Sequence, residues 1–388
     1  MDYRTFGDWR LSVIGYGCYG LSGAYGPVDE EKFSKTIRTA YEKGINFFDT
    51  AEGYGEAEVF LGKAVAPFRD QVMIATKLSG ESGSPDLSFH AVHAACEASL
   101  TRLNMDVIDL YQIHFDDPKT PVLETISALE DLVQEGKIRK YGLCHLSVEN
   151  VKEYAELGDP FSVLMELSPV ARTSLTTLLP VCKKHNMAAL AFSVTGRGIL
   201  SGRYSPGHEF DQSDIRRIDP LFKRERFESA MHVRDKLAEV GRFYQASAVQ
   251  MAIAWVLAQP QIACALTGTS STRHLEENIA ASEINFAEDD LDMINRFLDK
   301  EDKRLAFAQE GTIRRLLIEP LDQDPQIAFE DLVYVLETAI INGMVRESEV
   351  IPAFKELFAL RQNLDEKASQ RMRGIQITIR DKILKDRS

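Results

Sequence analysis

The chain has 388 residues, of which 44% are hydrophobic and 27% charged, the composition of an ordinary globular protein with one large domain or two smaller ones. Its formal net charge of -14 argues against a general affinity for nucleic acid or anionic membranes, because both are negatively charged themselves. The five cysteines are scattered without metal-binding spacing, and the start of the sequence does not resemble a secretory signal. No apolar run reaches the about 20 residues that span a bilayer. These features predict a cytoplasmic protein without a metal.

The chain opens with "MDYRTFGDWR", which predicts a small hairpin, and short apolar runs then predict eight strands, at 11–17, 45–50, 71–77, 107–114, 138–144, 161–167, 187–193 and 262–268. Stretches with the apolar periodicity of helices lie between them, at 29–43, 56–66, 88–103, 121–135, 147–157, 173–185 and 245–258. Strands that are apolar throughout and are followed by helices indicate a parallel sheet with its outer face covered. Eight such units predict an α/β protein, a (β/α)8 TIM barrel.

A doubly wound parallel sheet is the competing architecture. It usually has a glycine fingerprint that opens a helix directly after the first strand, and the glycines of "GYGCYGLSG" are not placed ahead of a helix in that way. Helices at 271–281 and near 287–298 close the last barrel unit. Beyond about residue 300 only helical periodicity remains, with a predicted loop at 319–326, so we assign 1–300 to the barrel and 303–388 to an appended helical C-terminal extension.

Four ionisable side chains follow neighbouring predicted strands. Asp49 ends the second strand and Tyr54 lies in the loop beyond it, while Lys77 ends the third strand and His114 the fourth. The C-terminal ends of barrel strands meet at one mouth, where catalytic residues gather, so we expect these side chains to converge. Each of them alone is an ordinary turn, rim or surface residue, but their joint occurrence favours a catalytic site.

Their chemistry is complementary. A tyrosine phenol, with a reference pKa of about 10, is a weak acid at neutral pH, and a neighbouring ammonium group stabilises the phenolate. Asp49 can hold the ammonium of Lys77 in place, and His114 can orient a carbonyl group by a hydrogen bond. This set predicts that Tyr54 protonates a carbonyl oxygen as a general acid while another group delivers hydride.

These motifs resemble the aldo-keto reductase family. "FDTAEGYG", "ATK" and "YQIH" stand where that family has its Asp–Tyr–Lys–His tetrad, and the resemblance continues through "GKIRKYGLCHLS", "AFSVTGRGILSGRY", "SDIRRIDPLF" and "TGTSSTRHLEENI". It covers roughly residues 1–300 and implies a barrel that binds NADPH, or less often NADH, across the strand ends without a metal. It also implies reduction of an aldehyde or ketone, or the reverse alcohol oxidation, with Tyr54 as general acid and base.

The resemblance further implies a set of cofactor contacts. An aromatic ring packs on the nicotinamide, glycines and arginines accommodate the pyrophosphate, and the segment that opens the helix after strand eight binds the adenosine phosphate. Here those contacts fall on Gly17, Cys18, Asp49, Cys144, His145, Phe192, Ser193, Thr195, Arg197, Arg203, Gly268, Thr269, Ser270, Ser271, His274, Glu277 and Asn278.

The chain departs from the family's pattern in two places. The family's Ser-Asn pair and Gln, which bind the carboxamide, are replaced by Cys144, His145 and Leu164, and only the histidine offers a strong hydrogen-bonding group. Many members also have Lys and Arg near the adenosine phosphate, where this chain has Gly268 and His274. Related branches use this glycine form, so NADP is the predicted cofactor, with Arg273 as a substitute contact.

Three functions fit this pattern. The first is a reductase of a small polar or sugar-like carbonyl compound, with Tyr19 and Tyr25 lining the pocket. The second is a cofactor-binding redox sensor or protein-interaction subunit with little catalysis, suggested by the altered carboxamide site and the extension. The third, a structural barrel without cofactor, does not account for the phosphate-side motifs. The apolar helical faces of the extension predict packing on the barrel, homo-oligomerisation or binding of a protein partner.

Overall fold

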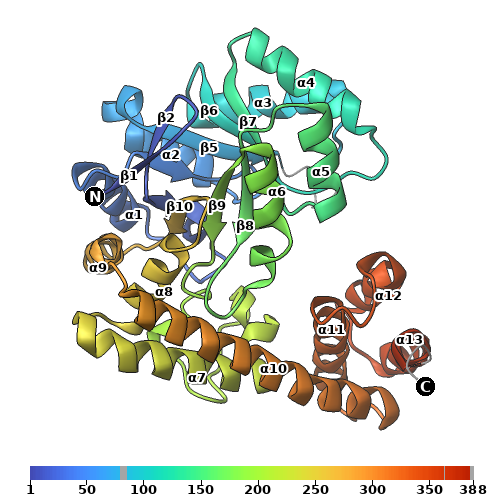
Figure 1. Cartoon of the computed structure of the whole chain (residues 1–388). Helices are drawn as coiled ribbons and strands as arrows, with labels where there is room; N and C mark the ends of the chain where they lie inside the picture. The colour runs from blue at the N-terminus through green and yellow to red at the C-terminus, as the bar shows by residue number, and fades with distance from the viewer. Residues whose placement is uncertain (79–84, 362, 385–388) are drawn as a thin grey trace. The chain divides into compact units, whose positions relative to one another are not determined.

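A computed structural model describes residues 1–78, 85–361 and 363–384 (Figure 1). The chain divides into two compact units. The barrel unit comprises Met1–Ile215 and Met231–Ile294, and the helical unit comprises Arg216–Ala230 and Asn295–Ser388. The division therefore falls a few residues before the boundary expected from the sequence, and it assigns an internal segment of the chain to the helical unit.

Within the described residues, eight parallel strands form a closed barrel in the order β10-β3-β4-β5-β6-β7-β8-β9, as Figure 1 shows in part. The strands are β3 (Ile14–Gly17), β4 (Phe47–Asp49), β5 (Met73–Leu78), β6 (Ile108–Ile113), β7 (Ile138–Cys144), β8 (Ser162–Glu166), β9 (Ala188–Phe192) and β10 (Ile262–Thr267). Every residue of β6 and β10 is buried, which explains why their sequences are mostly apolar and do not alternate with polar residues. The predicted (β/α)8 barrel is confirmed.

The N-terminal hairpin is confirmed too, and it covers one end of the barrel. Strands β1 (Tyr3–Phe6) and β2 (Trp9–Ser12) pair antiparallel, so the first predicted strand is divided between the hairpin and β3. Trp9 packs on Phe161, which directly precedes β8, with ring centroids 4.6 Å apart. The hairpin therefore lies at the N-terminal ends of the strands, and the C-terminal ends are left to the loops that carry the predicted site.

The helices predicted between the strands and directly after the last one are confirmed as α1 (Glu30–Glu42), α2 (Ala57–Val65), α3 (Phe89–Leu103), α4 (Val122–Gln134), α5 (Val148–Leu157), α6 (Leu178–His185), α8 (Ala248–Leu257) and α9 (Thr272–Ala280). Helix α7 (Arg224–Gly241) was not predicted, because its many charged residues dilute the apolar periodicity. Its first seven residues, 224–230, belong to the helical unit and the remainder to the barrel unit.

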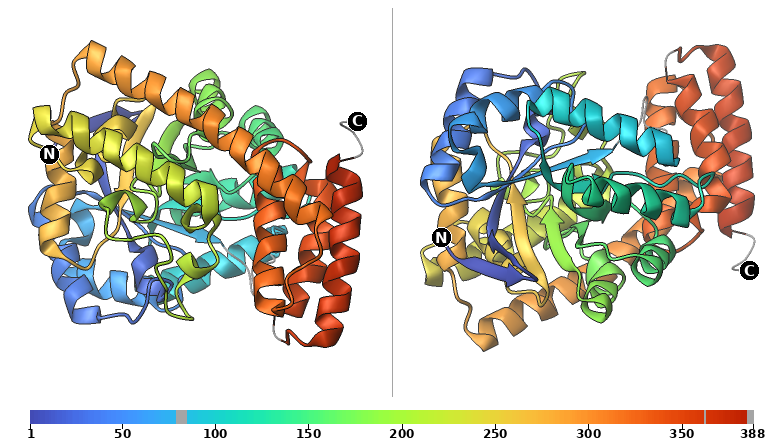
Figure 2. Two further views of the ribbon diagram at one scale, coloured as in Figure 1. Left: turned by 90° about the horizontal axis from the view of Figure 1, so that it is seen from below. Right: turned by 90° about the horizontal axis from the view of Figure 1, so that it is seen from above.

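The helical unit confirms the appended C-terminal helices. The helix predicted near 287–298 is longer, since α10 (Glu288–Ile318) continues through the expected boundary. After the predicted loop come α11 (Pro325–Ile341), α12 (Glu347–Leu360) and α13 (Glu366–Leu384), which lie side by side in Figure 2. Their inward faces form one apolar core that includes Phe329, Leu332, Leu357, Met372 and Ile379. No helix of the described residues is long and apolar enough to cross a membrane.

Candidate active site

A buried ion pair lies at the C-terminal ends of β4 and β5. The ammonium group of Lys77 donates to Asp49 Oδ1 at 2.6 Å and to the carbonyl oxygen of Thr50 at 2.7 Å. The side-chain amide of Gln112, on β6, donates to Asp49 Oδ2 at 3.0 Å. Both charged side chains are buried, where water cannot solvate them. The hydrogen bonds satisfy both carboxylate oxygens, and the carboxylate neutralises the ammonium group, so the cost of burying the two charges is offset.

Tyr54 stands beside this pair, in the loop after β4. Its ring centroid is 5.0 Å from Lys77 Nζ. The ring meets His114, directly after β6, edge to face at 5.7 Å, and meets Tyr19 edge to face at 5.0 Å. The structure thus brings together all four predicted catalytic side chains, and it places an aromatic side chain of the loop after β3 against the phenol.

Burial and charge set the protonation state of the cluster. Burial raises the pKa of Tyr54 well above its usual value, and the Lys77 ammonium opposes that rise. Burial lowers the pKa of Lys77, but the Asp49 carboxylate outweighs this and holds the pKa above its ordinary value. Burial, with Lys77 second, lowers the pKa of His114 to about 2. At neutral pH the cluster therefore holds a neutral phenol, a charged ammonium and a neutral imidazole.

Gln112 was missed in the sequence. It lies two residues before His114 in "YQIH", and β6 is buried on both faces, so its apolar neighbours conceal an inward-facing amide. The register pairs it with Lys77, which places the amide within reach of the neighbouring carboxylate. A polar residue in a mostly apolar strand was the available signal.

The predicted carboxamide side of the cofactor site is poor in hydrogen-bonding groups. Cys144, at the end of β7, pairs in register with Leu164 on β8, and both side chains are buried. Burial raises the pKa of the Cys144 thiol to about 12, so it is a neutral, weak donor. His145 follows with a left-handed φ of 37°, and its ring lies 5.4 Å from Phe115 and 5.2 Å from Phe192.

The loop after β9 carries four predicted contacts. It turns through left-handed backbone at Ser193, Arg197 and Gly198, with φ values of 54°, 51° and 88°. Arg197 forms an ion pair at 3.0 Å with Glu166, at the end of β8, so this part of the loop is tied to the barrel. Thr195 is half-buried in the same turn, whereas Arg203 is exposed on the stretch that follows.

The predicted phosphate side lies between β3, β10 and α9. A Cβ atom added to Gly268 would lie 2.5 Å from the carbonyl oxygen of Gly17, so the two loops approach closely and only glycine fits. Ser271 caps α9 by accepting from the His274 amide at 3.4 Å, and Thr269 Oγ1 accepts from the Ser271 amide at 3.0 Å. This short turn gathers hydroxyl groups at a helix N-terminus.

The remaining predicted contacts lie on or beside these elements. Cys18 is buried directly after β3, and Asn278 is buried on α9. Glu277 is held at 2.9 Å by Arg273, one turn earlier on the helix, and Ser270 lies in the turn before it. The residues therefore fit the phosphate end of a nicotinamide dinucleotide well and its carboxamide end poorly.

A metal was not predicted, although three potential ligand residues gather here. His114, Cys144 and His145 each bring one ligand atom within 4.8 Å of the others. The thiol is protonated, and the Lys77 ammonium acts electrostatically on both Cys144 and His114. Both features oppose a cation at this position, because thiolate rather than thiol is the metal ligand.

Comparisons with known proteins support the same reading. The sequence profile of the Aldo/keto reductase family matches residues 13–299. "Aldo-keto reductase str7" of Strobilurus tenacellus is 31% identical over 315 residues, which are 77% of this chain and 92% of that protein. The glycerol dehydrogenase AKR11B4 from Gluconobacter oxydans superposes with a TM-score of 0.70 at 28% identity, over 77% of this chain and 96% of that one. An aldo/keto reductase from Klebsiella pneumoniae, solved with NADP and acetate, gives a TM-score of 0.60 at 25% identity, over 75% and 93%.

Proposed function

Because the chain belongs to the aldo/keto reductase family, we propose that it catalyses NADPH-dependent reduction of an aldehyde or ketone, or the reverse oxidation of an alcohol. The family is one of oxidoreductases, and its profile covers the barrel strands and the site. The observation that carries the proposal is the buried Lys77–Asp49 pair at 2.6 Å with the ring of Tyr54 5.0 Å from the ammonium. A buried ammonium beside a half-buried phenol is an arrangement that suits tyrosine to act as a proton donor.

Each side chain has one task in this reaction. A bound nicotinamide would supply the hydride that adds to the carbonyl carbon. Tyr54 gives its phenolic proton to the carbonyl oxygen, and Lys77 stabilises the phenolate left behind until it regains a proton from solvent. Asp49 and Gln112 hold the ammonium in position, and the neutral imidazole of His114 donates one N–H group to orient the carbonyl oxygen.

NADP is the cofactor that the donor groups favour. The hydroxyl groups of Thr269, Ser270 and Ser271 at the start of α9 suit a phosphate group, and the close approach of Gly17 and Gly268 leaves no room there for a side chain at position 268. The Klebsiella relative binds NADP in its crystal structure. We expect NADP(H) to bind at least several-fold more tightly than NAD(H), measured by nicotinamide fluorescence, and equal affinities would contradict this assignment.

The substrate we propose is a small polar carbonyl compound. Tyr19 contacts both Tyr54 and Tyr25, at centroid distances of 5.0 and 5.3 Å, so aromatic rings with hydroxyl groups stand beside the reacting phenol. The glycerol dehydrogenase among the structural neighbours acts on a small polyol. The direct test follows NADPH consumption across small aldehydes, ketones and hydroxyketones, with bulky apolar ketones for comparison. Turnover of the bulky ketones alone would contradict the proposed substrate class.

A cofactor-binding sensor or interaction subunit is the second candidate. It is favoured by the buried thiol of Cys144 and the apolar Leu164, where a carboxamide needs strong hydrogen-bonding partners. Weak binding of the nicotinamide end would lower turnover and leave phosphate-driven binding intact. Tight NADPH binding without turnover of any compound in the panel would favour this candidate over the reductase.

A further inference from the structure

Tyr54 lies in the short loop between β4 and α2, and β5 holds the first part of this loop. The backbone amide of Thr50 donates to the carbonyl oxygen of Ala75 at 2.8 Å. The amide of Glu52 donates to the carbonyl oxygen of Lys77 at 3.2 Å. These bonds continue the pairing of β4 with β5 as far as Glu52, two residues before the proposed proton donor.

The backbone bonds of Tyr54 itself are local. Its amide donates to the carbonyl oxygen of Ala51 at 3.1 Å, and its own carbonyl oxygen accepts from the amide of Ala57, also at 3.1 Å. Each of these bonds joins residues three positions apart, so they shape the loop as turns. Contacts with other elements therefore set where the phenol lies.

Arg102, in the last turn of α3, makes such contacts on both sides of Tyr54. Its Nε group donates to Glu58 Oε2 at 2.5 Å, and its Nη2 atom lies 3.6 Å from Glu52 Oε1. Glu52 precedes Tyr54 by two residues, and Glu58 follows it by four, in the first turn of α2. One planar guanidinium group thus spans the loop that carries the phenol.

The carboxylate of Glu58 extends this connection to the strand that carries Lys77. Glu58 is fully buried, and its Oε1 atom accepts a hydrogen bond at 2.6 Å from the hydroxyl group of Thr76. Thr76 directly precedes Lys77 on β5, so the two side chains point to opposite faces of the strand. The guanidinium of Arg102 supplies the counter-charge that a buried carboxylate needs.

The guanidinium group is itself held in place. Its Nη2 group donates at 3.1 Å to the hydroxyl group of Ser99, a buried residue one turn earlier on α3. A Cβ atom added to Gly62 on α2 would overlap the carbonyl oxygen of Leu103, so the two helices touch directly beside Arg102. All of these residues belong to the barrel unit. Arg102 is therefore a fixed support rather than a mobile surface side chain.

We propose that Arg102 is a positioning residue, which keeps the phenol of Tyr54 beside the ammonium of Lys77. It acts by holding the loop through Glu52 and the start of α2 through Glu58. Proton transfer requires the donor to be within hydrogen-bond reach of the substrate, so a small displacement of the loop lowers the rate. The inference rests on the proposed function, because it requires Tyr54 to act as the proton donor.

The first test is Arg102→Met in the full chain. The change removes both ion pairs, and we expect kcat to fall about tenfold or more, since displacements of about 1 Å can cost a factor of about 10². The Kd for NADPH should stay the same. Turnover is expressed per bound NADPH, because a merely structural role would lower the fraction of chains that bind it. Unchanged turnover per bound NADPH would overturn the positioning role.

The matched control is Arg69→Met. Arg69, in the turn after α2, pairs at 2.7 Å with Asp109, a fully buried carboxylate near the start of β6. The same carboxylate accepts at 2.8 Å from the amide of Ile74, near the start of β5. This ion pair thus supports the same strand at the end away from Tyr54. The control should lower thermal stability and leave turnover per bound NADPH unchanged, whereas a loss as large as in Arg102→Met would overturn the inference.

A second background separates positioning from general damage. In Tyr54→Phe, where the phenol is absent, Arg102→Met should not lower the residual turnover further. A full additive loss would contradict the inference, because it would show that Arg102 acts on something other than the phenol.

Glu52→Ala tests the loop contact while Glu58 keeps its counter-charge, so it applies even where Arg102→Met does not fold. Turnover per bound NADPH should fall about threefold or more, within the range of coupling between contacting residues. Normal turnover in Tyr54→Phe refutes the proposed function itself. Lost turnover there, together with unchanged turnover in Glu52→Ala, refutes only the role of Arg102.

Discussion

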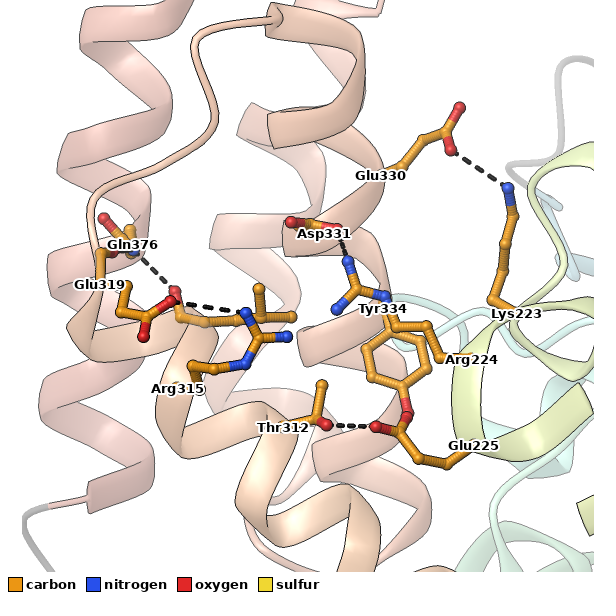
Figure 3. Close-up of polar contacts among 11 residues, drawn as sticks. Lys223, Arg224, Glu225, Thr312, Arg315, Glu319, Glu330, Asp331, Tyr334 and Gln376 are labelled. Carbon is orange, nitrogen blue, oxygen red and sulfur yellow. Dashed lines mark hydrogen bonds and ion pairs between the residues drawn. The ribbon is translucent and has the colours of Figure 1, made fainter. Parts of the chain in front are cut away.

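The barrel mouth and the helical unit both contain ion pairs, but the surroundings of these pairs differ. Asp49 and Lys77 lie at the ends of neighbouring parallel strands and are excluded from water. Lys223 and Glu330, which pair in the helical unit (Figure 3), retain 34% and 26% of their side-chain exposure. Water screens the second pair and leaves the first unscreened, so a buried pair controls protonation and reactivity while a half-exposed pair mainly holds a segment in place.

The largest effect is expected from Lys77→Met. The change leaves the Asp49 carboxylate buried without its counter-charge, which should cost about 3–5 kcal/mol of unfolding free energy. It also removes the ammonium beside the phenol, so any variant that remains folded should lose turnover. Urea denaturation and NADPH consumption measure the two effects. Stability close to that of the unaltered chain would mean that the ion pair does not behave as a buried one.

Tyr54→Phe tests reactivity without disturbing the buried pair. It removes the proposed proton donor and retains the ring, so kcat should fall by a factor of about 10² or more with little change in cofactor affinity. Tyr41→Phe is the control, because it removes a phenol that donates to Gln71 and has no part in the proposed reaction. Turnover close to normal in Tyr54→Phe would remove the phenol from the mechanism.

The neutral state of His114 predicts acid sensitivity. Its pKa falls from an ordinary value of 6.5 to about 2 on folding, so below pH 6.5 the unfolded chain binds a proton that the folded chain does not. Unfolding free energy should therefore decrease as the pH falls, by about 2 kcal/mol between pH 6.5 and 5. The titratable groups that face the imidazole of His114 are those of Lys77, Tyr54 and His145.

The measurement compares urea denaturation at several pH values for the unaltered chain, His114→Asn and His90→Asn. The first variant should lose this part of the pH dependence. The second should keep it, because His90 is exposed at the start of α3. An unchanged slope in His114→Asn would show that the imidazole is solvated rather than buried.

The smallest effect is expected from Lys223→Met. The half-exposed pair with Glu330 is screened by water, so its loss should cost less than about 1 kcal/mol of unfolding free energy. The same type of substitution at Lys77 should cost several times more, and the difference between the two variants measures the effect of burial directly. A cost in Lys223→Met as large as in Lys77→Met would abolish the contrast between the two regions.

Local pattern was sufficient for much of the fold and for part of the site. The eight apolar runs predicted the strands, and the position of Asp49, Lys77 and His114 at strand ends predicted their convergence, because parallel strands point their C-terminal ends to one side. Gln112 stood out only as a polar residue in a mostly apolar strand, and the structure was needed to show that its amide reaches Asp49. The cofactor contacts taken from the resemblance, Arg203 among them, stay predictions.

The sequence by itself determined the barrel, the hairpin, the helical extension and the residue types at the mouth, because these depend on periodicity and on neighbours along the chain. Only the tertiary structure decided which charges are buried, and it alone showed that residues 216–230 belong with the C-terminal helices. Glu225 and Tyr334 are separated by 109 positions along the chain. No local pattern encodes such a contact, because it forms only when distant helices pack together and exclude water from the groups between them.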